Sequence, residues 1–232
     1  MDPRQLFKDE RLTGMCAYCG ARPDTRDHVP SKVLLDEPYP PELPVVAACE
    51  KCNSEFSLDE QYLSCFLECV ICGTTDNSGL QRPKIKRILN ENPKLRYRIE
   101  ASKRKDEAGG LLWLPEIDRV RATVMKLARG HAAYELYPEL GEPVDVGFAP
   151  LLSLSDEQRV AFENVSTEDL QPYPEIGTRA FLRVFVVGGK ADPTQVSDWI
   201  VVQPGRYRYA VKDGLLVKFV LSEYLACMVS WE

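Results

Sequence analysis

The chain has 232 residues, 44% of them hydrophobic and 28% charged, and this composition excludes a wholly disordered protein. No stretch reaches the roughly 18 apolar residues of a membrane span. The first residues lack the apolar segment of a secretory signal, so we expect a cytoplasmic protein without a membrane partner. The net charge of −6 disfavours nucleic acid as a partner of the chain as a whole, because phosphate contacts need clustered Lys and Arg.

Eight cysteines in a cytoplasmic chain predict metal binding rather than disulfides, because thiols stay reduced there. Two Cys-x-x-Cys pairs flank a proline-rich segment at 38–44, which is expected to be extended, and a short apolar strand at 45–48. Four thiolates at this spacing can close a tetrahedral site with no open position, which is typical of structural zinc. The predicted zinc ligands are Cys16, Cys19, Cys49 and Cys52.

A third pair, Cys69 and Cys72, admits two interpretations. Together with the second pair it also has a legitimate zinc spacing. However, a helix is predicted over 57–71, starting at a capping-box pattern of Ser57 and Glu60, and it places the third pair on one face. Buried cysteine behaves as a small hydrophobic residue, so we favour core packing for this pair.

The remaining sequence predicts helices first and strands afterwards. Ten Lys and Arg against two Glu between 82 and 105 form a basic segment, interpreted as either a nucleic-acid contact or a solvated loop or helix face. Apolar spacing predicts a helix of about five turns that begins near Pro115 and ends near Tyr134, with His131 as a core histidine on its apolar stripe. A shorter helix is expected near 156–162.

Strand-rich segments follow, punctuated by Gly-Gly, Pro-Gly and Asp-Gly turns. Antiparallel strands are predicted at 180–187, 199–202, 207–211 and 215–221, with a fifth possible at 226–231. The predicted fold class is α+β, with a zinc-stabilised module over 1–75 and an α+β region over 76–232. Within that region, 82–135 is expected to be helical and 179–231 to form antiparallel strands, through which the chain could form a homodimer.

Between the first two cysteine pairs lies Asp27-His28-Val29-Pro30, and Asn53 follows the second pair directly. A zinc cage would bring these residues together. A carboxylate and an amide oxygen are hard ligands suited to Mg²⁺, and an imidazole can take a proton from an attacking water. The combination describes phosphodiester hydrolysis with one metal ion.

These motifs, Cys16-Ala-Tyr-Cys19, Asp27-His28-Val29-Pro30 and Cys49-Glu-Lys-Cys52-Asn53, resemble the HNH endonucleases with the ββα-metal finger. The resemblance implies a metal-dependent nuclease that cuts DNA rather than RNA. It implies that His28 is the general base, that Asp27 and Asn53 hold the catalytic Mg²⁺ or Mn²⁺, and that the four cysteines hold structural zinc. It covers residues 16–65, about a fifth of the chain.

One departure from the family pattern concerns the asparagine that usually precedes the second cysteine pair and orients the histidine. Here Glu42 is the only side chain of that stretch able to accept a hydrogen bond, so either it or a backbone carbonyl must fix the His28 tautomer. Residues 16–60 are also acidic overall. The alternative is therefore a catalytically inactive zinc-stabilised module that binds nucleic acid or protein. The expected phosphate contacts are Arg26, Lys32, Lys84, Lys86 and Arg87.

Overall fold

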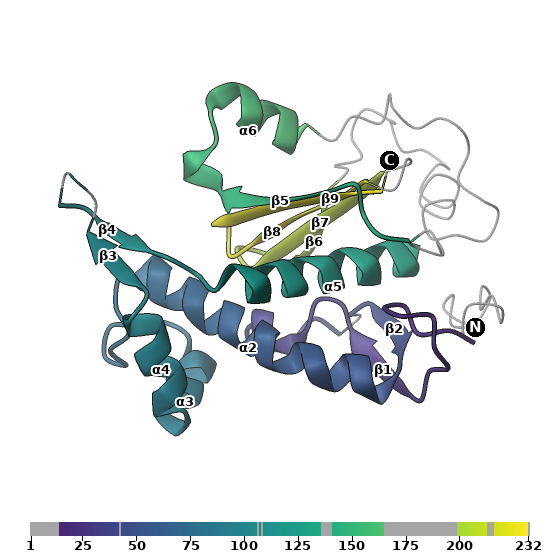
Figure 1. The fold of residues 1–232 in the computed structure, drawn as a ribbon, viewed down its shortest axis with the longest axis horizontal. Coiled ribbons are helices and arrows are strands. Elements are labelled where there is room, and N and C mark those ends of the chain that lie inside the picture. Colours follow the sequence, from purple (N-terminus) through teal and green to yellow (C-terminus); the bar gives the residue numbers. More distant parts are fainter. Residues whose placement is uncertain are drawn as a thin grey trace.

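A computed structural model describes residues 14–41, 43–105, 107, 109–135, 141–164, 199–212 and 216–231 (Figure 1). Over these residues the chain is α+β, with an N-terminal hairpin and long helix, a middle helical part, and a C-terminal antiparallel sheet. Helix α5 lies between the long helix α2 and the sheet (Figure 1). None of the described helices combines the length and apolar character needed to cross a membrane.

The N-terminal hairpin pairs β1 (Thr25–His28) with β2 (Val45–Ala48) in antiparallel register, and a 3-10 helix, η1 (Lys32–Leu34), lies between them. Helix α2 (Glu50–Cys72) follows and begins well before the predicted start at Ser57. Its N-cap is Cys49, whose Sγ accepts the N–H of Cys52 at 3.5 Å. Ser57 lies inside the helix and donates to the Ser54 carbonyl, so its capping-box pattern does not mark a start.

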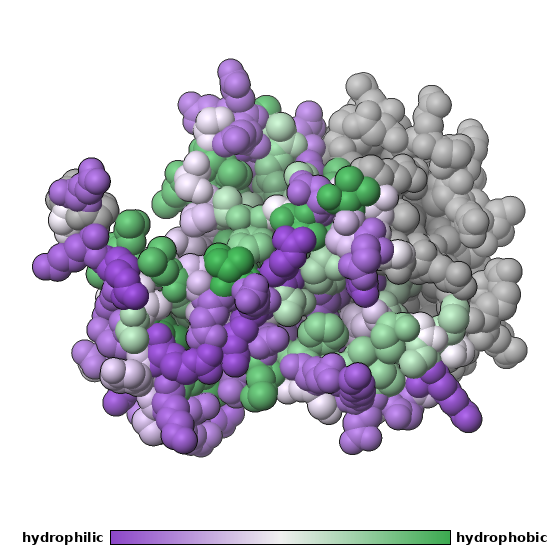
Figure 2. Space-filling model, viewed as in Figure 1, coloured by the Kyte–Doolittle hydropathy of each residue, from purple (hydrophilic) through white to green (hydrophobic). Residues whose placement is uncertain are grey.

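The basic segment folds into two short helices and a strand. These elements, together with the strand that completes the small hairpin, are α3 (Pro83–Glu91), α4 (Pro93–Glu100), β3 (Lys103–Lys105) and β4 (Leu111–Trp113). Each helix starts with proline, whose fixed φ suits the first turn. Hydrophilic side chains gather over α3 and α4 (Figure 2).

The inner faces of α3 and α4 pack on the second half of α2 in a core of their own. Cys65 and Cys69 are fully buried there, and Cys72 packs against the same core. The interpretation of Cys69 and Cys72 as core residues is therefore confirmed. Arg82 lies between this core and the loop after β1, where its guanidinium donates to the carbonyls of Val33 and Leu35.

Helix α5 (Ile117–Glu135) contacts α2 on one side and the sheet on the other. Over the described residues the sheet has the strand order β5-β9-β8-β7-β6. Its strands are β5 (Asp145–Pro150), β6 (Ile200–Gln203), β7 (Tyr207–Lys212), β8 (Leu216–Leu221) and β9 (Leu225–Ser230). Alternate residues of β8 face opposite sides. Phe219 packs toward α5, whereas Val220 packs toward η2 (Leu151–Ser153) and α6 (Asp156–Glu163).

The structure confirms the predicted helices near 117–134 and 156–162 and the strands near 199–202, 207–211, 215–221 and 226–231. His131 is confirmed as a core residue: it is fully buried, and its Nε2 lies 2.7 Å from the hydroxyl of Tyr207. Strand β5 was not predicted, because its segment reads as proline- and glycine-rich. The predicted strand at 180–187 and the Asp213-Gly214 turn lie outside the described residues.

Candidate functional site

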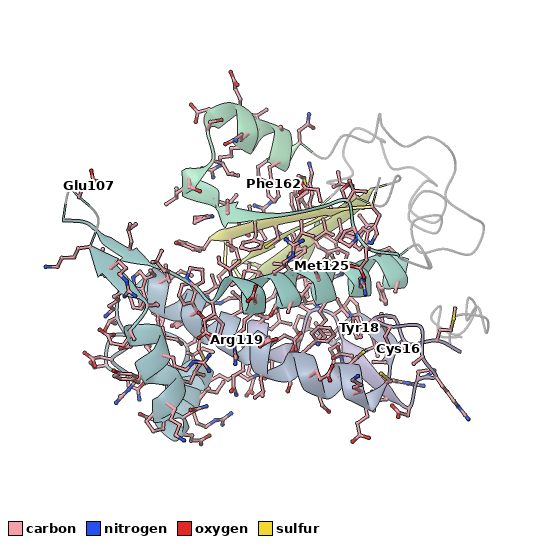
Figure 3. All side chains as sticks on the ribbon, in the orientation of Figure 1. Cys16, Tyr18, Glu107, Arg119, Met125 and Phe162 are labelled. Carbon is pink, nitrogen blue, oxygen red and sulfur yellow. The ribbon has the colours of Figure 1, made fainter. Side chains whose placement is uncertain are left out.

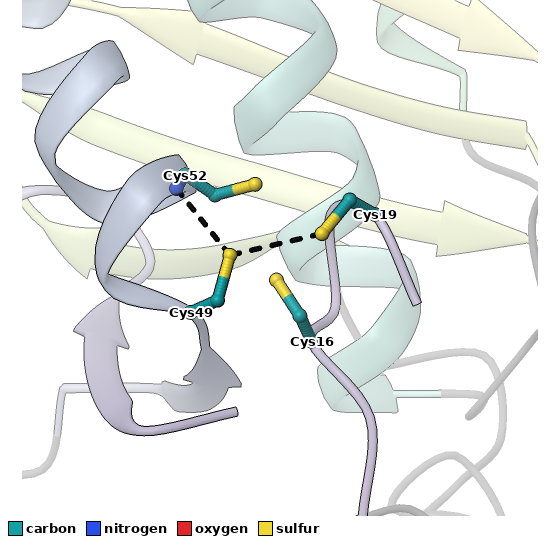
Figure 4. A group of neighbouring side chains, drawn as sticks. All are labelled: Cys16, Cys19, Cys49 and Cys52. Atoms are coloured by element: carbon teal, nitrogen blue, oxygen red, sulfur yellow. Dashed lines mark hydrogen bonds between the residues drawn. The ribbon is translucent and has the colours of Figure 1, made fainter. Parts of the chain in front are cut away.

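Four cysteine thiols converge where the hairpin meets the start of α2 (Figure 4). Their Sγ atoms all lie within 4.8 Å of one another, and the Sγ atoms of Cys19 and Cys49 are 3.7 Å apart. A tetrahedral zinc ion with Zn–S bonds of about 2.3 Å places its sulfurs about 3.8 Å apart. The cluster therefore fits a structural zinc ion, as the sequence predicted for Cys16, Cys19, Cys49 and Cys52, and it is the only such group among the described residues.

The local backbone explains why these thiols meet. The N–H of Gly20 donates to the Cys16 carbonyl at 2.9 Å, which closes a tight turn and brings Cys19 back beside Cys16. The amide of Cys52 lowers the pKa of the Cys49 thiol, whereas burial raises the pKa of Cys52.

The predicted catalytic residues sit on two elements beside this cluster. His28 ends β1, Asp27 precedes it, and Asn53 lies in the first turn of α2. The Asn53 side-chain amide donates to Thr25 Oγ1 at 3.4 Å and to the Arg26 carbonyl at 3.5 Å. Within the described part of the chain, no hydrogen bond or ion pair links Asn53 to Asp27 or His28. The side-chain N–H groups of Asn53 therefore link the first turn of α2 to β1.

His28 is partly exposed, and its environment favours the neutral imidazole. Burial, followed by the Lys32 ammonium, lowers the pKa of His28, while Asp27 acts in the opposite direction. Its Nδ1 is buried and accepts or donates no hydrogen bond among the described residues. Glu42, the side chain expected to orient the ring, lies outside those residues. A neutral imidazole near pH 7 can accept a proton, which is what a general base requires.

Asp27 is buried and already engaged by two groups. Its Oδ2 accepts a hydrogen bond from the Tyr18 hydroxyl at 2.8 Å and forms an ion pair with Lys126 Nζ at 2.7 Å. The same Nζ lies 2.7 Å from Oε1 of Glu60. Lys126 and Glu60 are each only 2% exposed. An ammonium from α5 thus bridges two carboxylates, one from β1 and one from α2.

These contacts test whether Asp27 fits a divalent ion. Its charge is balanced by the Lys126 ammonium, and both contacts fall on one oxygen. The ammonium of Lys126 would repel a divalent ion bound to the same carboxylate. Asp27 therefore already has a cation partner, and the expectation of Mg²⁺ or Mn²⁺ held by Asp27 finds no support in the geometry.

The expected phosphate contacts are partly assembled next to His28. Lys84 Nζ donates to the Lys32 carbonyl at 2.9 Å and contacts the Tyr39 hydroxyl. The ammonium groups of Lys32 and Lys84 lie 5.6 Å and 4.8 Å from the centroid of the Tyr39 ring. Burial lowers the pKa of Lys84, the Glu37 carboxylate acts in the opposite direction, and the charges of Arg82 and Arg87 lower it further, so Arg87 lies near the same group. We call Lys32, Tyr39, Lys84 and Arg87 the basic patch.

The other basic residues named above or contained in the basic segment either lie outside this patch or form contacts that stabilise the fold. Arg26 is exposed on β1, and Lys86 is half-buried on α3. Arg82 is buried, with its Nε 2.6 Å from Asp36 Oδ1, and so holds the loop after β1 in place. Arg98 pairs with Glu116 on the protein itself.

Sequence reasoning missed Lys126, Glu60, Tyr18 and Tyr39. A lysine on a helix normally keeps its ammonium in water, and no local pattern marks Lys126 as an exception. Tyr18 lies inside the first cysteine turn and packs beside α5 (Figure 3), where the Arg129 guanidinium donates to its carbonyl at 2.8 Å. Comparisons of the chain with protein-family models, curated proteins and solved structures returned no match.

Proposed function

We propose that this chain is a nuclease that hydrolyses phosphodiester bonds, in DNA rather than RNA, with His28 as the general base. The observation that carries the proposal is the position of His28. It lies at the end of a strand fastened by the thiol cluster, and Lys32 of the basic patch follows four residues later. The HNH resemblance of the surrounding motifs supports the same chemistry.

The chemistry assigned to the chain's own residues is limited to three roles. His28 takes a proton from the attacking water while the water oxygen bonds to phosphorus, the bond to the leaving ester oxygen breaks, and that oxygen takes a proton from solvent water. General-base help typically accelerates such reactions about 10²–10⁴-fold. Lys32, Lys84 and Arg87 offset phosphate charge along the backbone of the substrate. The four cysteines hold structural zinc, which fixes the hairpin that carries His28. No step is assigned to Mg²⁺ or Mn²⁺, because Asp27 is already paired with Lys126.

A second candidate is a zinc-stabilised module that binds nucleic acid without cutting it. Two observations favour it. Asp27 and Asn53 each form contacts with other groups. Within the described residues, no hydrogen bond or ion pair joins the side chains of Asp27, His28 and Asn53. In this case the basic patch would account for the binding, and His28 would be a structural neighbour of Lys32.

A cleavage assay on supercoiled plasmid separates the two candidates. Zinc-loaded wild type should nick the plasmid, and His28→Ala should lower the rate at least about 10²-fold, because the general base is removed. Arg121→Ala, which removes an exposed cation of α5, is the control and should cut at the wild-type rate. Equal cutting by His28→Ala and wild type would remove His28 from the reaction.

Binding is measured separately by fluorescence anisotropy on duplex DNA and on an RNA of the same sequence. Lys32→Gln and Arg87→Gln should each weaken DNA binding and reduce the salt slope by about 1, whereas Arg121→Gln should not. Binding without any cleavage would favour the second candidate. An unchanged salt slope in both patch variants would show that the basic patch does not contact phosphate.

A further inference from the structure

The ammonium of Lys126 contacts four side chains from the cysteine-bearing part of the chain. Asp27 comes from β1, Tyr18 from the first cysteine turn, and Phe56 and Glu60 from α2. The Nζ atom lies 2.7 Å from a carboxylate oxygen of each acid, and 5.6 Å and 5.7 Å from the ring centroids of Tyr18 and Phe56. Two carboxylates and two aromatic faces all attract a cation.

We call Tyr18, Asp27, Phe56 and Glu60 the ammonium cage. The rings of Tyr18 and Phe56 also pack edge to face, with centroids 5.6 Å apart, so the apolar wall of the cage is continuous. Burial raises the pKa of Glu60 to about 7, which lets the cage be neutral with Lys126 and Asp27 charged. The cage is thus a fully formed cation site, and its cation comes from another element of the chain.

Neighbouring contacts fix how α5 presents Lys126. Lys126, Arg129 and Gly130 share one face of the helix, since they are separated by three and four residues. Arg129 donates to the Tyr18 carbonyl at 2.8 Å. A Cβ on Gly130 would lie only 2.6 Å from a methyl group of Val29, so this helix face meets the residue after His28 directly. The position of the ammonium therefore follows from the docking of the whole helix.

We propose that Lys126 permanently supplies the cation at Asp27, in the place where the HNH resemblance expects a divalent ion. Asp27 is then a positioning residue, which holds the strand that carries His28 against α5, and not a metal ligand. The catalytic part of this inference rests on the proposed function: cleavage of the phosphodiester bond with His28 as general base should proceed without a divalent ion on Asp27. Whether Lys126 or a divalent ion occupies the position beside Asp27 is a property of the folded chain, so it can be tested without substrate.

Manganese binding, followed by electron paramagnetic resonance on zinc-saturated protein, tests the proposal directly. Wild type and Asp27→Asn should show the same weak, nonspecific binding of Mn²⁺. Lys126→Met removes the ammonium and leaves two carboxylates facing one position, so it should gain a Mn²⁺ site. That site should disappear in the double variant Lys126→Met, Asp27→Asn. Lys94→Met, on the exposed face of α4, is the matched control and should gain nothing.

A Mn²⁺ site in the wild type that Asp27→Asn removes would overturn the proposal, as would a folded Lys126→Met protein without a new site. If Lys126→Met does not fold, the comparison of wild type with Asp27→Asn decides alone: equal binding supports the proposal, and a loss overturns it. Failure of the proposed function looks different, since a chain that never cuts nucleic acid can still show either Mn²⁺ result.

The effect of the proposal on catalysis is tested by measuring the cleavage rate of the zinc-loaded protein with and without added Mg²⁺ or Mn²⁺. The proposal expects that the cleavage rate of wild type changes less than twofold with either ion. A rise of tenfold or more that Asp27→Asn abolishes, while His28→Ala remains inactive, would overturn the proposal and leave the proposed function standing.

Discussion

Two cages fasten the same hairpin to the rest of the molecule, and they do so by opposite means. The thiol cluster joins the first cysteine turn to the start of α2, and its four sulfurs could be held together by a structural metal ion such as zinc. The ammonium cage joins the hairpin and α2 to α5, and it receives its cation from Lys126, which lies 66 residues along the chain from Glu60. The first cage would take its cation from solution, whereas the second takes its cation from the chain itself.

The thiol cluster and the ammonium cage stabilise different contacts of the hairpin. The thiol cluster holds the first cysteine turn against the start of α2, in a segment that also contributes Tyr18, Val29 and Val46 to the main core. The ammonium cage connects parts that are distant in sequence, and a buried charge accepts only a partner of the right sign and geometry. We therefore expect loss of zinc to disturb the first cysteine turn, and loss of the Lys126 ammonium to weaken the contact between the hairpin and α5.

Removal of the zinc cage should have the largest effect. Cys49→Ser deletes one of four ligands, and structural zinc binds with an apparent energy of roughly 10–16 kcal/mol. We expect the variant to lose bound zinc and the cooperative part of its thermal unfolding, measured by metal analysis and circular dichroism. Cys72→Ser, which lies outside the cluster, should keep its zinc. Full zinc content in Cys49→Ser would contradict the assignment.

Loss of the Lys126 ammonium should have the second largest effect on the stability of the protein. Lys126→Met leaves the buried Asp27 carboxylate without its counter-charge and the Glu60 carboxyl without its ion-pair partner, which typically destabilises a protein by about 3–5 kcal/mol. Urea unfolding of zinc-saturated protein measures the difference, and addition of Asp27→Asn and Glu60→Gln should restore part of it. The exposed Lys94→Met should stay within about 0.5 kcal/mol of wild type. A similarly small change for Lys126→Met would mean that the cage contributes little.

The pH dependence of stability should show a smaller effect that originates in Glu60. Its pKa is raised to about 7 in the folded chain, so between its ordinary value and about 7 the folded state holds a proton that the unfolded state has released. Stability from this group should therefore fall as the pH rises from about 4.5 to about 7, by about 3 kcal/mol in total. Urea unfolding across that range should give a flatter curve for Glu60→Gln. Parallel curves for variant and wild type would exclude Glu60 as the source.

Local patterns in the sequence predicted most of the elements and the zinc ligands. Cysteine spacing is set by the geometry of one metal ion, so it can be recognised without the fold. Apolar periodicity likewise identified α5 and placed His131 in the core, because the stripe of a buried helix is continuous. The start of α2 was misplaced because Cys49, which is not a common N-cap residue, takes that role through its sulfur.

The interior of the candidate site could not be predicted in the same way. Lys126 lies in a helix whose sequence gives no sign that its ammonium enters the core, and its partners come from three earlier segments. Asp27 next to His28 was therefore interpreted as a metal ligand, since the residue that neutralises it is far away in sequence. Strand β5 was missed for a related reason: its partner is β9, at the other end of the region, and a mixed local composition hides an edge strand.

At Gly130 the absence of a side chain lets the Val29 side chain pack directly against the backbone of α5. The methyl carbons of Val29 occupy the space in which a Cβ would project, at 2.6 and 2.9 Å. Glycine weakens a helix interior by about 1 kcal/mol relative to alanine, yet an alanine here would have to lift α5 away from the hairpin. Because Lys126 precedes Gly130 by one helical turn, the same displacement would withdraw its nitrogen from Asp27. The glycine at position 130 thus contributes to the short distance between Lys126 Nζ and the Asp27 carboxylate.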